Sequence, residues 1–300
     1  MMVFRCSFSK PYEAFSGNWI DKNKMKILDT HHHLWNLSMR SYDWISELPE
    51  NESVKINKNF LLNDLDYLAK INKVTGTICV QAHQSEEEAL WLLEIAKNSD
   101  LIKGVVCWVD LKDSDIGYSL DKYQSYDKFC GIRHVWHDEK NEDWIMDTKV
   151  IAGLKVLSER LINFDFLVRP NHLKYIFEVY EKIPKLNGVI DHIAKPNIKD
   201  NTFDPWAKDI YDLSKIDSLS CKVSGMVEEM NESQSISVLK TYTNHIIKSF
   251  GPNKIMYGSN WPVCLTKKSY SEVLDIAKKI SINVDSEKFF YTNGKNFYLN

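Results

Sequence analysis

The stretch Ile27-Leu-Asp-Thr-His-His-His-Leu-Trp35 begins as an apolar strand and ends in a cluster of ionisable side chains. Successive residues of a strand point to opposite faces, so Asp29, His31 and His33 share one face and His32 points away from it. Two imidazoles at the end of a strand can bind a metal ion or a substrate oxygen. A solvated turn or a low-complexity patch would have the same local sequence, so the rest of the chain must decide.

An apolar strand followed by helical sequence recurs along the chain. Predicted strands begin at residues 27, 76, 102, 131, 164, 188, 218 and 254. Predicted helices cover about 61–72, 86–98, 114–123, 149–161, 170–183, 206–213, 236–250, 271–280 and 286–297, while residues 36–59 are expected to form a loop. Continuous apolar strands need cover on both faces, as in parallel sheets. We therefore expect a single (β/α)8 TIM-type barrel over residues 25–300, with a doubly wound open sheet as the alternative.

The composition narrows the class of partner. Hydrophobic residues make up 44% and charged residues 26% of the 300 positions, as in an ordinary globular protein. The net charge is −3 and no segment is densely basic, so nucleic acid is not expected as a partner. No apolar run approaches the roughly 20 residues that cross a bilayer, and no glycine-rich phosphate loop follows a strand. A small-molecule substrate is the expected partner, and a homodimer is left open.

Residues 1–24 lack the apolar core of a secretion signal. Met25 directly precedes the first strand, so this segment is either an N-terminal arm or the product of an upstream start codon. Four of the six cysteines, Cys79, Cys107, Cys130 and Cys221, fall in predicted strands, and no CxxC pair occurs. We expect free buried thiols, which favours a reducing, cytoplasmic location.

Polar and aromatic side chains end nearly every predicted strand, and a (β/α)8 barrel builds its active site there. They are His31, His33, Trp35, Gln81, His83, Trp108, Asp110, Arg133, His134, His137, Asp165, Arg169, Asp191, His192, Lys222, Ser224, Asn260 and Trp261. Burying an unpaired polar group costs roughly 1–3 kcal/mol, so a purely structural barrel would have little reason to gather so many. The imidazoles of His31, His33 and His192 match the ligands of a divalent metal.

A series of short motifs also occurs in a fixed order. The motifs are Asp29-Thr-His-His-His-Leu-Trp35, Gly104-Val-Val-Cys-Trp-Val-Asp-Leu111, Gly131-Ile-Arg-His134, Leu167-Val-Arg-Pro170, Asp191-His-Ile-Ala-Lys-Pro196, Cys221-Lys-Val-Ser-Gly225 and Gly258-Ser-Asn-Trp-Pro-Val-Cys264. This series resembles the amidohydrolase-2 branch of the amidohydrolase superfamily, and within it the sugar-lactone hydrolases related to L-fuconolactonase and L-rhamnono-lactonase. The resemblance covers about residues 25–300 and implies a TIM-type barrel that hydrolyses a cyclic ester.

The resemblance also implies roles for individual residues. His31 and His33 match the HxH motif of the first strand, and His192 matches the histidine of the sixth. Asn260 stands where the superfamily usually has an aspartate that deprotonates the attacking water. Arg169 replaces the fifth-strand metal histidine, and the bridging lysine is absent from the end of the fourth strand, where Arg133 stands. These departures argue against a binuclear centre and leave one divalent metal, such as Zn, or none.

We expect Arg133, with Arg169 or Lys222, to polarise the ester carbonyl. His192, or the pair His31 and His33, would position or protonate the substrate. Trp35, Trp108 and Trp136 would face the sugar ring, and the other expected substrate contacts are Gln81, His134 and Trp261.

The asparagine at position 260 divides the functional hypotheses, because an amide cannot accept a proton at neutral pH. In the favoured hypothesis the chain is a working lactonase in which a metal-bound hydroxide, His192 or Asp110 replaces the carboxylate; losing a general base slows an enzyme about 10²–10⁴-fold. In the second it is a ligand-binding protein with little or no hydrolytic activity. A third, an amidohydrolase-2 decarboxylase acting on an aromatic acid, rests on the fold and the HxH motif alone.

Overall fold

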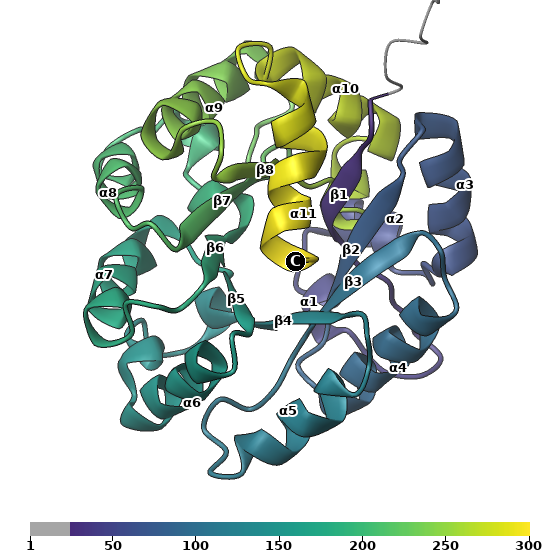
Figure 1. Cartoon of the computed structure of the whole chain (residues 1–300). Coiled ribbons are helices and arrows are strands. Elements are labelled where there is room, and N and C mark those ends of the chain that lie inside the picture. The colour runs from purple at the N-terminus through teal and green to yellow at the C-terminus, as the bar shows by residue number, and fades with distance from the viewer. Residues whose placement is uncertain (1–24) are drawn as a thin grey trace, which may run out of the picture.

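Eight parallel strands form one sheet in the order β1 to β8. The computed structural model describes residues 25–300, so the predicted arm, 1–24, lies outside the described residues and the boundary at residue 25 stays a prediction. The strands are β1 Leu28–His32, β2 Gly76–Val80, β3 Ile102–Cys107, β4 Phe129–His134, β5 Asn163–Phe166, β6 Gly188–Ile190, β7 Leu219–Val223 and β8 Ile255–Tyr257. Each strand pairs with the next, and Figure 1 shows them as a ring.

The first and last strands complete the barrel. His32 and Trp261 form a parallel bridge, and the His33 amide donates to the Trp261 carbonyl at 2.7 Å. The Asn260 amide donates to the His31 carbonyl at 2.8 Å. These contacts exclude the open doubly wound sheet and confirm the predicted (β/α)8 barrel.

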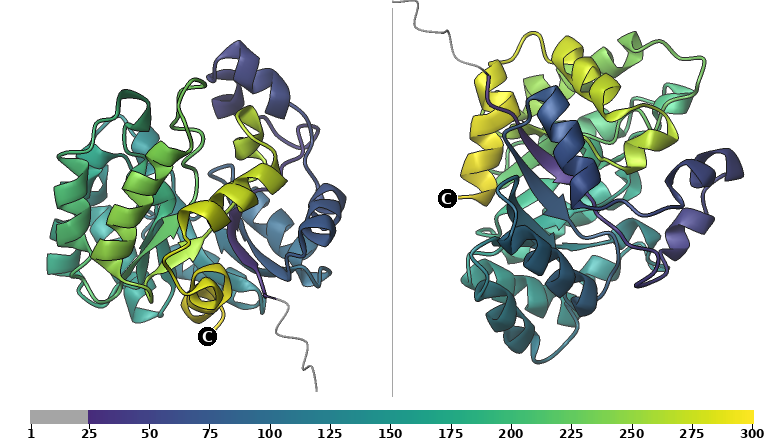
Figure 2. Two further views of the ribbon diagram at one scale, coloured as in Figure 1. Left: turned by 90° about the horizontal axis from the view of Figure 1, so that it is seen from above. Right: turned by 90° about the vertical axis from the view of Figure 1, so that its right-hand side faces the viewer.

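Most of the helices surround the strands on the outside of the ring (Figures 1 and 2). The helices of the described residues are α1 Asp43–Ser46, α2 Glu50–Ile56, α3 Leu62–Asn72, α4 Glu86–Lys97, α5 Ile116–Gln124, α6 Thr148–Glu159, α7 Leu173–Lys182, α8 Trp206–Leu213, α9 Ser237–Phe250, α10 Tyr270–Ile280 and α11 Asn293–Tyr298. The helices α1 and α2 occupy the segment that was expected to be a loop. They are only 4 and 7 residues long, too short for a helical repeat of apolar residues to stand out in the sequence.

The strands β6 and β8 are shorter than predicted, because the chain turns into left-handed backbone after each of them. Residues 192–195 have φ of 53°, 48°, 63° and 46°, and Asn260 has φ 57°. The side chains expected at the ends of these two strands are therefore carried by tight turns.

One end of the barrel is closed by the C-terminal helix. Figure 1 shows α11 lying across the ring of strands. Asn163, the first residue of β5, donates to the Phe297 carbonyl at 3.0 Å, which places α11 at the N-terminal ends of the strands. Tyr298 packs inside the barrel against Leu28 and Met256. The opposite end, where barrel enzymes carry their active sites, is left for a functional site.

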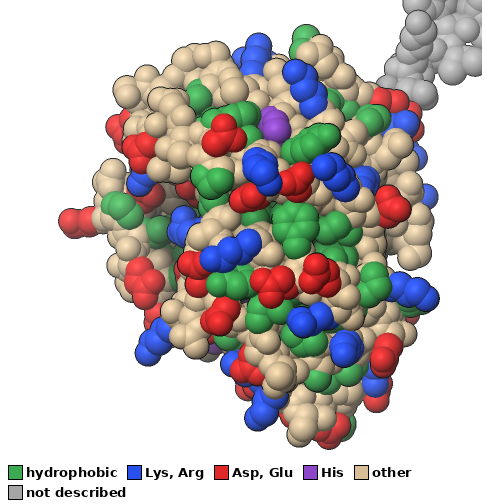
Figure 3. Space-filling model, turned by 90° about the vertical axis from the view of Figure 1, so that its left-hand side faces the viewer, with side chains coloured by type: hydrophobic (Ala, Val, Ile, Leu, Met, Phe, Trp, Pro, Cys, Tyr) green, Lys and Arg blue, Asp and Glu red, His purple; other side chains and the backbone are tan. Residues whose placement is uncertain are grey.

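The charge distribution on the surface and the state of the cysteines match what the sequence predicts. On the face over α7 and α8 in Figure 3, acidic and basic side chains are interspersed, and neither sign forms a continuous stripe. Within residues 25–300, no helix has the length and apolar character required to cross a membrane. Cys79, Cys107, Cys130 and Cys221 are free thiols, as predicted.

Candidate active site

A cavity of about 130 Å³ lies at the C-terminal ends of the strands. Its polar lining residues are His33, Arg133, His137, Asp138, His192, Lys195 and Asn260, and its apolar ones are Trp44, Ala82, Val135, Leu167 and Val263. An engineered cavity of about 150 Å³ holds a benzene molecule, so this space suits a single six-membered ring. Side chains from β4 and from the turns after β1, β6 and β8 meet at this wall.

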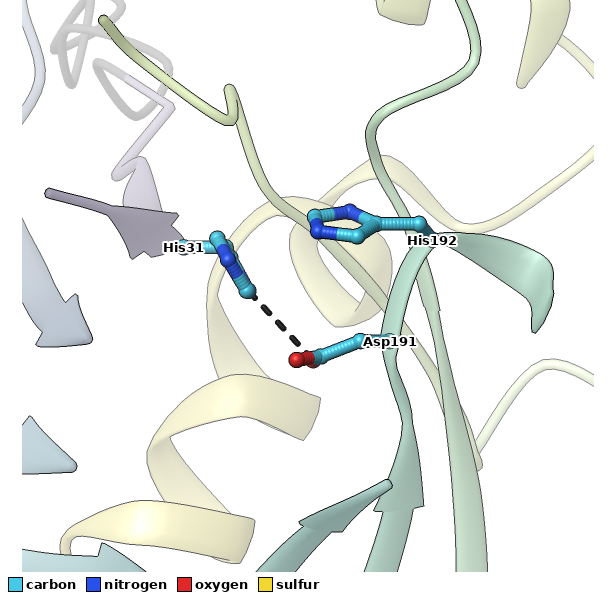
Figure 4. Close-up of side chains that lie close together, drawn as sticks. All are labelled: His31, Asp191 and His192. Carbon is cyan, nitrogen blue, oxygen red and sulfur yellow. Dashed lines mark ion pairs between the residues drawn. The ribbon is translucent and has the colours of Figure 1, made fainter. Parts of the chain in front are cut away.

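A buried ionic cluster lies behind the cavity wall. The Asp191 carboxylate is 3.0 Å from the Lys222 ammonium, 3.4 Å from the Arg133 guanidinium and 3.3 Å from His31 Nδ1. Figure 4 shows the rings of His31 and His192 close to this carboxylate, with the ion pair between His31 and Asp191 as a dashed line. The charges of Lys222 and Arg133 overcome burial and lower the pKa of Asp191, so it stays ionised.

Lys222 is held inside the barrel and has no exposed surface. Its ammonium lies 2.6 Å from Asp165 Oδ2 and 3.1 Å from His31 Nδ1. The Tyr298 hydroxyl of α11 donates to the same aspartate at 2.8 Å. Two carboxylates and a histidine thus surround the Lys222 ammonium, and Lys222 does not line the cavity.

The histidines of the site are neutral at pH 7. Burial, helped by the charge of Lys222, holds the pKa of His31 well below its usual range, and burial lowers the pKa of His33 to about 3. His33 Nδ1 is 2.8 Å from the Val80 carbonyl, which only accepts, so Nδ1 carries the proton and Nε2 is an acceptor. Burial likewise lowers the pKa of His192, whose Nδ1 is 2.8 Å from Ser224 Oγ.

The closest group of metal-ligating side chains in residues 25–300 is His31, Asp191 and His192, whose donor atoms lie within 4.8 Å of one another. The set expected from the sequence contained His33 in place of Asp191. The His33 ring is near His31, with centroids 4.9 Å apart, but its Nδ1 is engaged by the Val80 carbonyl.

The turn after β6 presents two side chains to the cavity. His192, Ile193, Ala194 and Lys195 are all left-handed, a conformation that costs about 1–2 kcal/mol for each non-glycine residue. The Trp206 indole holds the turn by donating to the Ile193 carbonyl at 2.7 Å. Backbone strain of this kind is concentrated at functional sites.

Lys195 was not among the expected site residues, although it lies in the quoted motif Asp191–Pro196. Lys195 lies beyond the end of β6, and the left-handed turn brings its side chain back to the cavity. Burial lowers the pKa of Lys195, and its ammonium has no ion pair or hydrogen bond to any residue from 25 to 300. A cation free of protein partners is available to a ligand.

Asn260 lines the cavity, and its side chain meets a carboxylate that the sequence analysis did not single out. Its Nδ2 donates to Glu228 Oε1 at 2.8 Å. Glu228 lies in the loop after β7, five residues beyond the strand end, so reading the strand ends could not find it. Burial raises the pKa of Glu228 to about 7.

Two of the expected aromatic contacts belong to the core. Trp35 is fully buried, donates from its indole to the Lys58 carbonyl at 2.7 Å, and packs edge-on against Phe60. Trp261 also packs edge-on against Phe60. Trp35 does not line the cavity, and its ring packs against Tyr42 and Trp44 as well as Phe60. Trp44 of α1 lines the cavity.

The remaining expected contacts lie beside the cavity and do not line it. Trp108 donates to His134 Nδ1 at 3.2 Å, and the His134 ring stacks on Trp144 with centroids 3.8 Å apart. The Gln81 carbonyl accepts from Arg133 and so positions that guanidinium.

Three other side chains that were named from the sequence do not line the cavity. Arg169 and Asp110 are exposed, and Asp110 caps the Lys112 amide at 2.8 Å. Trp136 is buried and donates to the Glu142 carbonyl at 3.0 Å.

Comparison with known proteins places the chain in a family. A family model described as Amidohydrolase matches residues 28–298. The L-fucono-1,5-lactonase of Burkholderia ambifaria is 30% identical over 236 residues, which cover 79% of this chain and 80% of that protein.

Solved structures show the same fold. The crystal structure of a Burkholderia multivorans amidohydrolase with bound zinc has a TM-score of 0.84 and 24% identity, covering 91% of this chain and 98% of that one. A 2,6-dihydroxybenzoate decarboxylase is more distant, with a TM-score of 0.62 and 11% identity over 91% of this chain and 98% of its own. The match of the family model over nearly the whole barrel shows that this chain belongs to the amidohydrolase family.

Proposed function

We propose that this protein hydrolyses a sugar lactone, adding water across the ring ester to give the aldonic acid. The observation that carries the proposal is that two cations, Arg133 and Lys195, reach a cavity the size of one ring at the C-terminal end of the barrel. The related lactonase from Burkholderia ambifaria supports the substrate class. A 1,5-lactone is a six-membered ring, and its carbonyl oxygen becomes negatively charged when water attacks.

Arg133 and Lys195 would stabilise that developing oxyanion. Arg133 is held ready by the Gln81 carbonyl and by Asp191, so little reorganisation is needed during the reaction. Lys195 has no competing partner among the described residues. Preorganised charge at the oxyanion is commonly worth about 10²–10³ in rate for each group removed.

The neutral histidines would recognise the hydroxyl groups and the ring oxygen. Ser224 engages His192 through Nδ1, which leaves Nε2 for a ligand. His33 presents Nε2 as an acceptor because Nδ1 donates to Val80. Both rings belong to the cavity wall, so a bound lactone would contact them.

His31, Asp191 and His192 would hold a divalent ion. Their donor atoms lie within 4.8 Å of one another, and imidazole and carboxylate are ligands of Zn²⁺. A bound ion supplies positive charge and lowers the pKa of water to about 7. Lys222 and Arg133 contact the same donors, so we expect these two cations to weaken binding of the ion.

The proposal is tested by a pH-stat assay on aldono-lactones of both ring sizes, including L-fucono-1,5-lactone, with and without a chelator. Turnover that survives chelation assigns the reaction to the protein groups alone, and turnover lost on chelation assigns it to the metal-assisted form. No turnover on any lactone, with a lactone or aldonic acid still raising the melting temperature, would contradict hydrolysis. It would favour the ligand-binding alternative, for which Asn260 in place of a carboxylate is the supporting observation. Release of carbon dioxide from a benzoate-type acid would favour the decarboxylase instead.

Lys195→Met should lower kcat/KM about 10²–10³-fold, because it removes a cation from the oxyanion without breaking any ion pair. The melting temperature should stay close to that of the wild type. Lys199→Met is the matched control, since Lys199 is exposed on the same connection and its ammonium makes no hydrogen bond or ion pair with residues 25–300. Equal activity of the two variants would remove Lys195 from the proposed site.

A further inference from the structure

We propose that Glu228 accepts the proton of the attacking water, in place of the carboxylate that Asn260 does not provide. This assignment rests on the proposed lactonase activity. Asn260 lines the cavity, and the Glu228 carboxylate lies directly behind it, with 2.8 Å between Oε1 and the amide nitrogen. A base is therefore held one hydrogen bond from the wall where the asparagine stands.

The Glu228 carboxylate keeps most of its accepting capacity. An ionised carboxylate has about four acceptor positions, and among residues 25–300 only Asn260 donates a hydrogen bond to it. Oε2 is shielded from solvent and has no hydrogen-bond partner among residues 25–300. An unpartnered buried oxygen costs about 1–3 kcal/mol, which argues against a purely structural role.

The surroundings of Glu228 suit a proton acceptor that works near neutral pH. Lys195 faces it from the turn after β6, the Cys264 thiol from the segment after β8, and Glu229 from its own loop. Burial and Glu229 raise its pKa, and Lys195 lowers it, with a result of about 7. A general base is most effective when its pKa lies near the working pH.

The other carboxylates near the cavity are less suited to this step. Asp191 is paired with Lys222 and Arg133, which lower its pKa and make it a weak base. Asp138 is exposed to solvent and paired with His137 at 3.3 Å. Asp110 is exposed and caps a backbone amide.

The proton balance of the step is simple. The water oxygen forms a bond to the lactone carbonyl carbon while one water proton passes to the Glu228 carboxylate, and the carbonyl electrons move to the oxygen near Arg133 and Lys195. The tetrahedral intermediate then breaks its bond to the ring oxygen, and the proton on Glu228 passes to that leaving alkoxide. The products are the hydroxy acid and the regenerated carboxylate.

Glu228→Gln tests the assignment because glutamine can still accept from Asn260 but cannot take a proton. We expect kcat to fall about 10²–10⁴-fold and the melting temperature to change little. Glu232→Gln, at an exposed position on the same loop, should stay within about threefold of wild type. For the wild type, kcat/KM should rise between pH 5 and pH 8 with an apparent pKa near 7, after subtraction of spontaneous hydrolysis, and Glu228→Gln should lose this dependence.

The exchange variant Glu228→Gln/Asn260→Asp moves the carboxylate across the same hydrogen bond. Its kcat should be at least about tenfold higher than that of Glu228→Gln. If the single variant does not fold, activity of the exchange variant tests whether a carboxylate at this hydrogen bond is required. Wild-type activity in Glu228→Gln, or a pH dependence that the substitution leaves in place, would overturn the role of Glu228 while lactone hydrolysis stands. Absence of turnover in the wild type would instead overturn the proposed function.

Discussion

Burial decides the charge of individual residues around the cavity. The pKa of His33 falls to about 3 and that of His137 to about 2, whereas that of Glu228 rises to about 7. The imidazoles are therefore neutral at pH 7, and the positive charge facing a ligand comes from Arg133 and Lys195. A neutral histidine can both donate and accept a hydrogen bond, which suits recognition of sugar hydroxyl groups.

Glu88 gives a residue-level prediction about stability and pH. It is buried and accepts hydrogen bonds from the amides of Ala82 and His83 at 2.9 and 2.7 Å and from the Tyr42 hydroxyl. Burial raises its pKa from 4.5 to about 7, so the folded protein binds this proton more tightly than the unfolded chain. Its stabilising contribution is full below pH 4.5, declines as the pH rises to about 7, and is lost above that.

Urea unfolding of wild type and Glu88→Gln between pH 4.5 and pH 8 measures this contribution. The difference in unfolding free energy between the two proteins should change by about 3 kcal/mol across the window, with the wild type favoured at low pH. A difference that is constant with pH would contradict the prediction.

At the scale of elements, the connections after β6, β7 and β8 build the site together. Five of the eight non-glycine residues with positive φ in residues 25–300 lie in the turns that carry His192, Lys195 and Asn260. The loop after β7 approaches His192 closely at Gly225, which has φ 59°. A Cβ there would lie 2.5 Å from His192 Nδ1, so only glycine allows this approach.

Gly225→Ala should therefore reduce both stability and activity. The left-handed backbone costs about 1–2 kcal/mol, and displacement of His192 should lower kcat/KM at least about tenfold, since a misplacement of 1 Å can cost about 10² in rate. Gly251→Ala is the control: Gly251 follows α9 with φ 72°, and a Cβ there meets no atom within 4 Å. It should lose stability and keep its activity below the melting temperature. Equal losses of activity in both variants would show that the contact with His192 is unimportant.

Across the whole molecule, a chain of buried charges joins the C-terminal helix to the active site. Tyr298 of α11 donates to Asp165, Asp165 binds Lys222 at 2.6 Å, and Lys222 binds Asp191 and His31. The helix that closes the N-terminal end of the barrel thus helps to fix the ionic cluster at the other end. Its hydroxyl group is a structural part of the site although it lies outside the cavity.

Tyr298→Phe should lower the unfolding free energy by about 1.5–3 kcal/mol, the value of a hydrogen bond to a charged group. The phenyl ring keeps its packing inside the barrel, so the loss reports the hydroxyl alone. Tyr118→Phe is the control, because that side chain is 71% exposed. Chemical unfolding of the two variants measures the difference, and equal stabilities would show that the hydrogen bond to Asp165 contributes nothing.

The sequence by itself determined the barrel and the strand ends that surround the site. Apolar strands alternating with helical periodicity are local patterns, and eight such units must close or cover a parallel sheet. A residue at or just after the end of a strand places its side chain at the C-terminal end of the barrel. For this reason the sequence pointed to four of the residues that line the cavity: His33, Arg133, His192 and Asn260.

Only the tertiary structure decided which polar groups are free and which are paired. In the sequence, Lys222 and Lys195 are both lysines near strand ends. In the structure, Lys222 forms an ion pair with Asp165 inside the barrel, whereas Lys195 lines the cavity without an ion-pair partner among the described residues. Trp35 is buried in the core. The alternation of side chains along a strand predicts which face of the sheet a residue occupies, but it does not predict which segments cover that face. Glu228 and Asn260 are 32 residues apart in the sequence, and they meet because the barrel brings the connections after β7 and β8 together. A hydrogen bond depends on proximity in space, and local sequence patterns do not record that proximity.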